Sequence, residues 1–246
     1  MTASAGPALS LRGVSKRFGG LAALSELALD IPLGEIHGLI GPNGAGKTTA
    51  INIATGFYAP DEGSVWMFDR EVTRLPPDER AGLGFARTFQ SSRVFGNLDV
   101  RTNLAIAVEQ RRRCEGAGRG ARDVHTEVDA LLDAGGLREY AGEPGRLLPY
   151  GRQKQLEIVR ATAFARSVLL LDEPAAGLSD TDIEAVLAHV LAHRGRLAIL
   201  IVEHNMDVVM STCDRVTVID AGRWIATGTP DEVQRDPGVV AAYLGA

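Results

Sequence analysis

The stretch GPNGAGKT, from Gly41 to Thr48, decides the fold of this chain. It fits the pattern G-x-x-x-x-G-K-[S/T] and follows the apolar run EIHGLI of residues 35–40, which is typical of a buried strand. Its glycines let backbone N–H groups converge on phosphate oxygens without a Cβ in the way. Lys47 is expected to reach the β- and γ-phosphates, and Thr48 to offer its hydroxyl to Mg²⁺. The stretch therefore predicts a nucleotide-binding loop that opens a helix, whose positive end faces the anion.

A second acidic motif, VLLLDE at residues 168–173, supports this interpretation. Its apolar residues predict a buried strand, with Asp172 and Glu173 at the carboxyl end, where doubly wound sheets bind ligands. Asp172 is expected to bind Mg²⁺ through water, and Glu173 to orient and deprotonate the attacking water. Taken alone, two adjacent carboxylates are equally consistent with a strand-end turn or a helix cap. Beside a phosphate-binding loop, they favour nucleotide hydrolysis.

Composition narrows the class of protein. The chain has 246 residues, of which 45% are hydrophobic and 23% charged, as expected for one large α/β unit with a sizeable core. A formal net charge of -5 argues against nucleic-acid binding through a broad basic surface. Two cysteines, Cys114 and Cys213, favour a reducing compartment. The N-terminus lacks signal-peptide features, and no apolar run approaches the roughly 18 residues of a membrane span. We expect any membrane link to pass through a partner.

The order of predicted elements indicates the architecture. Extended segments come first (residues 9–18, 27–31, 63–69 and 84–90), and helical periodicity follows from about Leu98 to Ala165. Strands then alternate with helices, which predicts a largely parallel sheet covered on both faces. The fold class is therefore α/β with a P-loop NTPase core, in one domain over residues 1–246. The helical block, at about 92–165, is expected to be a lobe inserted into that core, with RRRCEGAGRGARD (111–123) as an exposed connection.

Several classes of P-loop protein remain open at this point. A GTPase would carry a guanine-reading N-K-x-D segment, which the sequence lacks. A small-molecule kinase would need an arginine-rich lid, for which residues 111–123 are a poor candidate. The order of further short motifs decides among these classes.

Those motifs resemble the ATP-binding-cassette (ABC) family over nearly the whole chain. SKRFGG contains Phe18, similar to the aromatic that stacks on adenine, and RTFQ contains Gln90, similar to the Q-loop glutamine. LPYGRQ (148–153) resembles the signature motif, AGLSD (176–180) resembles the D-loop, and VEH ends in His204, similar to the switch histidine. Each motif is weak alone, but together and in this order they are specific. The resemblance implies an N-terminal antiparallel β subdomain and the inserted helical lobe.

The resemblance also implies roles for individual residues. The implied catalytic residues are Gln90, Glu173 and His204. The implied Mg²⁺ ligands are Thr48, Gln90 and Asp172. The implied ATP contacts are Phe18, Gly41, Pro42, Asn43, Gly44, Ala45, Gly46, Lys47, Thr48 and Thr49. The implied signature residues, which reach the ATP of a partner ATPase, are Leu148, Pro149, Tyr150, Gly151, Arg152 and Gln153.

Longer segments resemble one branch of the family, the ATPase subunits of branched-chain amino acid importers. These segments are residues 41–63, 87–104, 150–161, 169–179, 201–210 and 228–245. The resemblance implies a second ATPase, usually in a heterodimer, two transmembrane permease subunits and, indirectly, a solute-binding protein. It places the chain at the cytoplasmic face of the membrane. Urea or amide importers, a lipopolysaccharide-type exporter and non-transport ABC ATPases remain alternatives, because the substrate does not touch the cassette.

The signature departs from the family pattern L-S-G-G-Q. Pro149 stands at the serine position, and Arg152 at the glutamine position. Proline suits the first turn of a helix, but it loses a hydroxyl-to-phosphate hydrogen bond worth roughly 1.5–3 kcal/mol. If that loss were confined to the transition state, hydrolysis at the partner's ATP would slow about 10- to 100-fold. Because Gly151 keeps its N–H, we expect a weakened site and an asymmetric pair.

Two smaller features have simple interpretations. Ser179, where many family members have Asp or Asn, is expected to be the N-cap of a helix that begins near Thr181. His189 and His193 lie four residues apart on a predicted helix and could bind a metal, but exposed helix histidines are the favoured interpretation.

Overall fold

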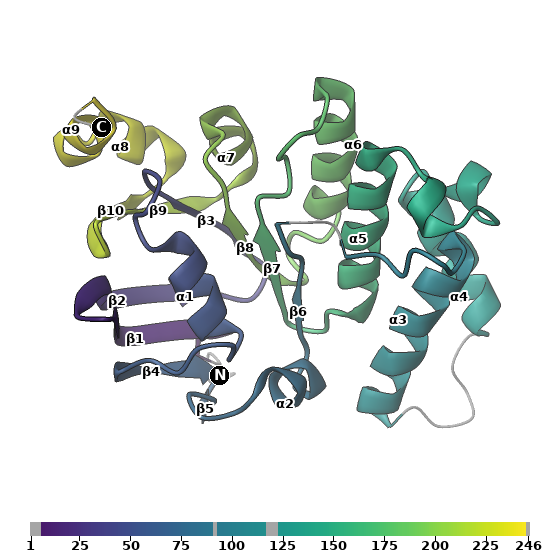
Figure 1. The fold of residues 1–246 in the computed structure, drawn as a ribbon, viewed down its shortest axis with the longest axis horizontal. Helices are drawn as coiled ribbons and strands as arrows, with labels where there is room; N and C mark the ends of the chain where they lie inside the picture. Colours follow the sequence, from purple (N-terminus) through teal and green to yellow (C-terminus); the bar gives the residue numbers. More distant parts are fainter. Residues whose placement is uncertain (1–5, 91–92, 117–122, 245–246) are drawn as a thin grey trace, which may run out of the picture.

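The computed structural model describes residues 6–90, 93–116 and 123–244, and within them the strands form two sheets (Figure 1). The N-terminal sheet is antiparallel, with strand order β2-β1-β4-β5. Its strands are β1 (Leu9–Phe18), β2 (Leu21–Ile31), β4 (Glu62–Met67) and β5 (Arg70–Glu71). The expected antiparallel β subdomain is therefore present.

The second sheet is mostly parallel and has the order β10-β9-β3-β8-β7-β6, with β10 antiparallel to β9. Its strands are β3 (Ile36–Ile40), β6 (Phe85–Arg87), β7 (Val168–Asp172), β8 (Ala198–Val202), β9 (Arg215–Asp220) and β10 (Arg223–Gly228). Every residue of β3, β7 and β8 is buried, as expected for parallel strands covered on both faces. The sheet brings the ends of β3, β6, β7 and β8 to one edge, where the site forms.

Two hydrophobic cores cover the two faces of this sheet. The first core joins it to the N-terminal sheet and to α1 (Lys47–Ala54), which lies between the sheets in Figure 1. The second core packs the opposite face against helices and the C-terminal segment. Side chains of β7 alternate between them: Leu170 belongs to the first core, and Leu169 and Leu171 belong to the second. The remaining helices around the sheets are α2 (Pro77–Gly82), α6 (Asp180–Leu191), α7 (Met206–Thr212), α8 (Pro230–Arg235) and α9 (Pro237–Leu244).

A third core belongs to the helices that the sequence assigns to the lobe. They are α3 (Val100–Glu115), α4 (Val124–Ala134) and α5 (Tyr150–Phe164), with short 3₁₀ turns at Arg138–Tyr140 and Gly145–Leu147. In Figure 1, α3 and α4 lie at one end of the molecule, away from the N-terminal sheet. Helix α5 contributes to two of the three cores. Ile158 and Ala161 lie in the second core, and Leu156 and Val159 lie in the third.

The structure corrects one boundary. Residues 111–115 are not a connection, because α3 continues to Glu115 and ends at Gly116 in the left-handed conformation, although residues 113–115 are exposed as predicted. Arg111 and Arg112 both pair with Glu127 of α4, which ties the two helices together. Residues 117–122 of the predicted connection lie outside the described part of the chain. In that part, no helix is long and apolar enough to cross a membrane.

The structure also corrects the prediction that His189 and His193 are exposed helix residues, and it confirms the predicted N-cap at Ser179. His189 is buried, not exposed; its Nε2 lies 2.9 Å from Thr162 Oγ1 of α5, and burial lowers its pKa. Helix α6 ends at Leu191, so His193 follows it, half-buried against the His189 ring. Ser179 is the N-cap of α6, and its side chain accepts a hydrogen bond from the Asp182 N–H.

Candidate nucleotide site

The glycine-rich loop runs from the end of β3 into α1, as the sequence predicts. Gly46, the N-cap of α1, has a left-handed φ of 103°, and a Cβ there would lie 2.4 Å from the carbonyl oxygen of Ala23. A Cβ on Gly41 would lie 2.0 Å from the carbonyl oxygen of Ile219. The backbones of β2 and β9 thus enclose the loop, and only glycine fits at these two positions.

Lys47 folds back over this loop. Its Nζ donates hydrogen bonds to the carbonyl oxygens of Gly41, at 2.6 Å, and Pro42, at 2.9 Å. Burial lowers the pKa of Lys47, and the negative charge of Glu173 partly offsets this shift. The two carbonyls hold the ammonium group at the mouth of the loop, which suits a cation that meets phosphate oxygens.

The three predicted catalytic side chains come together around Glu173. Its Oε2 accepts a hydrogen bond from Gln90 Nε2 at 3.0 Å, and its Oε1 lies 3.7 Å from His204 Nδ1. Glu173 itself has a φ of 48°, unusual for a residue with a side chain, and its N–H bonds to the carbonyl of Val202 at 2.8 Å. Such a conformation costs of order 1–3 kcal/mol and persists where the surroundings fix it, as they often do at functional sites.

Asp172 has a partner that the sequence did not reveal. Its Oδ2 accepts a hydrogen bond from Arg87 Nη2 at 3.0 Å, and both side chains are nearly buried. Arg87 also donates to Asn52 Oδ1 and Thr55 Oγ1 of the α1 region, at 2.7 and 3.0 Å. Arg87 lies in the RTFQ segment, but nothing in that segment indicates a partner 85 residues away.

Glu203 is a second residue that sequence reasoning missed. It is fully buried, and its Oε2 accepts the N–H groups of His204 and Asn205 at 3.0 and 3.3 Å. Its Oε1 accepts the N–H of Ala175, at 2.8 Å, in the segment after Glu173. One carboxylate thus fixes the backbone on both sides of the cluster of Gln90, Glu173 and His204. The signal that could have revealed Glu203 in the sequence was the acidic residue directly before the histidine in VEH.

A cavity of about 880 Å³ contains the predicted metal ligands. Thr48, Gln90 and Asp172 all line it. A hydroxyl, an amide carbonyl and a carboxylate are oxygen donors of the kind that Mg²⁺ prefers, with substrate phosphates completing its shell. In the described part of the chain, Asp172 Oδ1 makes no hydrogen bond, so it is available to an ion or its water. The donor set therefore fits Mg²⁺.

Phe18 lies at the exposed end of β1. Its ring packs edge-on against Tyr58, with centroids 5.5 Å apart, and the Lys16 ammonium lies 5.7 Å from its centroid. Tyr58 lines the same 880 Å³ cavity. The ring remains 45% exposed, which leaves surface for a stacking partner. The other predicted ATP contacts, Asn43, Gly44, Ala45 and Thr49, lie within the loop and the first turn of α1.

The signature residues form the start of α5. Pro149 is its N-cap and makes no side-chain cap bond, while Leu148 before it is buried. Tyr150 is 46% exposed, and its hydroxyl donates to the carbonyl of Ala176 in the D-loop segment at 3.3 Å. A Cβ on Gly151 would lie 2.4 Å from Asp182 Oδ2, so α5 and α6 touch at this point.

The last two signature residues point in different directions. Arg152 turns toward the lobe, where its Nη1 donates to Gln155 Oε1 and its guanidinium lies 6.0 Å from the Tyr140 ring centroid. Its positive charge is thus partly engaged away from the helix start. Gln153 donates to the carbonyl of Leu148 at 2.9 Å. Tyr150 and Gln153 line the same cavity as Thr48.

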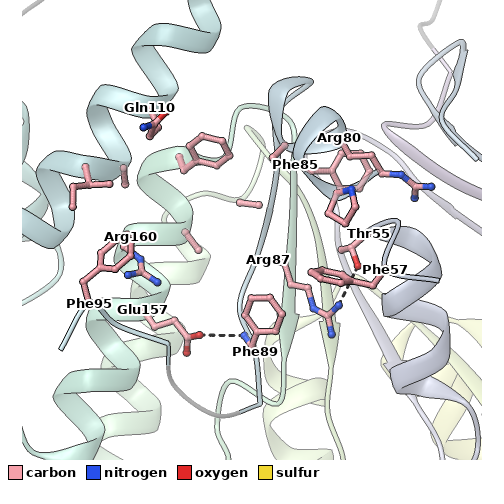
Figure 2. Close-up of a pocket in the computed structure, with 17 residues that line it drawn as sticks. Thr55, Phe57, Arg80, Phe85, Arg87, Phe89, Phe95, Gln110, Glu157 and Arg160 are labelled. Carbon is pink, nitrogen blue, oxygen red and sulfur yellow. Dashed lines mark hydrogen bonds between the residues drawn. The ribbon is translucent and has the colours of Figure 1, made fainter. Parts of the chain in front are cut away.

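A second cavity, of about 350 Å³, lies between α2, β6 and the lobe helices (Figure 2). We call it the aromatic groove, because it is lined by Phe57, Phe85, Phe89, Phe95 and Phe164. Its polar groups are mostly engaged. The Arg160 guanidinium lies 4.6 Å from the Phe95 ring centroid, and Glu157 accepts the N–H of Phe89 at 3.1 Å.

A phosphate-binding loop, an acidic strand end and a glutamine and histidine around one glutamate define an ATP-binding cassette, the ATPase module of ABC proteins. The comparison with known families agrees: the ABC transporter family matches residues 24–176. The branched-chain amino acid ATP-binding cassette transporter family matches residues 225–246. The chain belongs to the ABC transporter ATP-binding family, and it is an ATPase of the transporter type.

Relatives match along nearly the full chain. The high-affinity branched-chain amino acid transport ATP-binding protein LivG of Salmonella typhimurium is 38% identical over 97% of this chain and 98% of its own length. The corresponding protein BraF of Pseudomonas aeruginosa is 36% identical over 97% of this chain and 98% of its own. A solved ABC transporter cassette in its ADP conformation is 29% identical, with a TM-score of 0.82 over 97% of this chain and 98% of that one. A nucleotide-free cassette is 27% identical, also with a TM-score of 0.82, over 97% of this chain and 99% of that one.

Proposed function

We propose that this chain is the ATP-hydrolysing subunit of an importer for branched-chain amino acids. The observation that carries the hydrolytic part is the convergence of Gln90 and His204 on Glu173. The substrate class is supported by the relatives LivG and BraF, and by the match of residues 225–246 to the branched-chain family.

In the proposed reaction, the loop from Gly41 to Gly46 and the start of α1 bind the ATP phosphates through backbone N–H groups. Lys47 exchanges its two carbonyl partners for phosphate oxygens. Phe18 stacks on the adenine. Thr48, Gln90 and Asp172 would hold Mg²⁺, which neutralises charge on the phosphates when bound.

Glu173 is the proposed general base. One carboxylate oxygen accepts a proton from the attacking water, while the Gln90 hydrogen bond holds the other oxygen in place. His204 lies on the far side of the same carboxylate and is proposed to contact the γ-phosphate. The buried Glu203 fixes the backbone N–H of His204 and thereby limits the motion of that side chain.

The chain is proposed to act as half of a pair, with a second ABC ATPase whose ATP meets the signature residues Leu148 to Gln153. Two permease subunits would hold the pair at the cytoplasmic face of the membrane, fed by a solute-binding protein. A helix of one permease subunit is the proposed occupant of the aromatic groove, since its phenylalanines offer an apolar surface next to the Q-loop segment. The lobe of residues 92–165, within one domain of 246 residues, is proposed to move when the pair closes on ATP.

Uptake of labelled solutes tests the proposal. Cells that lack the chain would receive either the wild type or Lys47→Ala, with the membrane fraction probed to show equal amounts of both. Leucine, isoleucine, valine, urea and a short amide would be offered separately. Recovery of leucine-type uptake with the wild type alone supports the importer. A membrane-bound chain that restores no uptake of these solutes contradicts it.

A further inference from the structure

Arg87 lies where the aromatic groove meets the nucleotide cavity. Three residues, Phe57, Arg87 and Phe89, line both spaces, and Figure 2 shows them together beside the groove. The Arg87 side chain is therefore part of the wall between a surface suited to a partner and the site of hydrolysis.

Two of the three hydrogen-bond partners of Arg87, Asp172 and Asn52, line the nucleotide cavity, and the third, Thr55, lines the groove. Nη2 donates to Asp172 Oδ2 at 3.0 Å, and Nη1 donates to Asn52 and Thr55 at 2.7 and 3.0 Å. The bond to Oδ2 fixes one oxygen of the Asp172 carboxylate, and Asp172 itself lines the nucleotide cavity. The planar fork of an arginine makes such simultaneous contacts possible, which a lysine cannot reproduce.

The aromatic contacts of Arg87 are Phe57 and Phe89, which line the groove as well as the nucleotide cavity. The guanidinium carbon lies 5.5 Å from the Phe57 ring centroid and 4.9 Å from that of Phe89. Its Nε is buried and has no hydrogen-bond partner among the described residues. Phe57 is 51% exposed, and any helix seated in the groove would press on it.

We propose that Arg87 is a positioning residue that relays contact at the aromatic groove to Asp172 and thereby to the nucleotide. This deepens, and rests on, the proposed Mg²⁺ site and groove. Pressure on Phe57 shifts the Arg87 guanidinium relative to the Phe57 and Phe89 rings. This shift changes how firmly the guanidinium holds Asp172 Oδ2. Because the guanidinium neutralises part of the Asp172 charge, a looser Arg87 leaves a carboxylate that attracts a divalent cation more strongly but is less well oriented.

Nucleotide binding by the purified full chain tests the first half of the relay. The measured quantity is the Kd for a fluorescent non-hydrolysable ATP analogue, once in EDTA and once in excess Mg²⁺. We call the ratio of the Kd in EDTA to the Kd in Mg²⁺ the Mg²⁺ gain. Arg87→Met should raise the Mg²⁺ gain on the order of tenfold, since a nearby cation is removed. In the pair reconstituted with the second ATPase, the same variant should lower the kcat of ATP hydrolysis on the order of tenfold, because the carboxylate is less well oriented. Arg87→Lys keeps the charge, and it should restore the Mg²⁺ gain of the wild type while kcat stays reduced.

A double-mutant cycle tests the second half. Phe57→Leu should raise the Mg²⁺ gain about two- to fivefold by weakening one cation–π contact. Phe95→Leu is the matched control, because Phe95 is a similarly exposed ring of the same groove that packs on Arg160 and not on Arg87. In the Arg87→Met background, Phe57→Leu should have no further effect.

The possible outcomes separate the relay from the site on which it depends. A wild type with equal Kd values in EDTA and Mg²⁺ would overturn the Mg²⁺ assignment, and the relay with it. A wild type with a clear Mg²⁺ gain that Arg87→Met does not raise overturns the relay alone. The relay also fails if Phe57→Leu acts equally in both backgrounds, or if Phe95→Leu matches it.

Discussion

Replacing Arg80 by methionine should be one of the most destabilising single changes in this chain. Arg80 is 1% exposed and has no carboxylate partner among the described residues. Instead, its guanidinium donates to four backbone carbonyls, those of Ile53, Ala54, Thr73 and Leu75, at 2.7–3.0 Å. Two of these carbonyls end α1, the helix that begins with Lys47. Burial lowers the pKa of Arg80 to about 10, so it remains charged at neutral pH and complements the negative end of that helix.

The magnitude follows from those four bonds. At a net value of about 1 kcal/mol each, with the carbonyls left without a donor, Arg80→Met should cost about 3–5 kcal/mol in the free energy of unfolding. For a domain of this size, that is a fall of about 10 °C in Tm. The protein should still fold, since natural domains have about 5–15 kcal/mol of stability. ATP binding should weaken as well, because the helix loses an anchor at its far end.

Urea unfolding of the isolated chain, followed by circular dichroism, measures this cost. The control is Arg138→Met, which removes an exposed arginine that pairs with Asp129 and Asp133. We expect no resolvable change for that control, because exposed ion pairs contribute little. If Arg80→Met were no more destabilising than Arg138→Met, the hydrogen bonds from Arg80 to the carbonyls would not be what holds α1 in place.

Three further predictions concern catalysis and pH. Glu173→Gln should reduce phosphate release at least about 100-fold while leaving the Kd for ATP near that of the wild type, and a parallel loss of binding would contradict the role of a general base. Pro149→Ser should speed hydrolysis at the partner's ATP by about 10- to 100-fold in the reconstituted pair, and an unchanged rate would show that the missing hydroxyl does not matter. Burial lowers the pKa of His193 to about 4, so the unfolded chain binds more protons between that value and the ordinary pKa of about 6.5. Stability should therefore fall as the pH drops through this window, and urea titrations of His193→Gln should show a shallower fall.

Local patterns in the sequence were sufficient for much of the fold. The strand before Gly41 and the strand that ends at Asp172 are mostly apolar, and both occur as buried parallel strands. Ser179 caps α6 because its hydroxyl reaches a backbone N–H three residues ahead, an interaction confined to one turn. The grouping of Gln90, Glu173 and His204 followed from the family resemblance, which fixes the order of motifs along the chain.

Contacts between distant segments were not predictable in the same way. The bond from Arg87 to Asp172 and the burial of Arg80 under α1 depend on how β6, β7 and α1 pack, and no spacing in the sequence records that. The burial of His189 has the same cause, since α5 covers it with Thr162. The sequence prediction ended α3 too early, because arginines are common both on exposed helix faces and in loops. What shows that Arg111 belongs to the helix is its ion pair with Glu127 on the neighbouring helix α4.

The position of α5 between two cores has a consequence for folding. Residues 154–159 of this helix are all buried. Their neighbours belong to the second core, which covers one face of the sheet (the sheet core), and to the third core, between the lobe helices (the lobe core). Neither core is complete without it, so the two should not form independently. We expect the amide hydrogens of α5 to exchange only through global unfolding, whereas those of α4, which packs in the third core alone, exchange through local opening of that helix. The helix that begins with the signature is thus the segment that makes the sheet core and the lobe core a single cooperative unit.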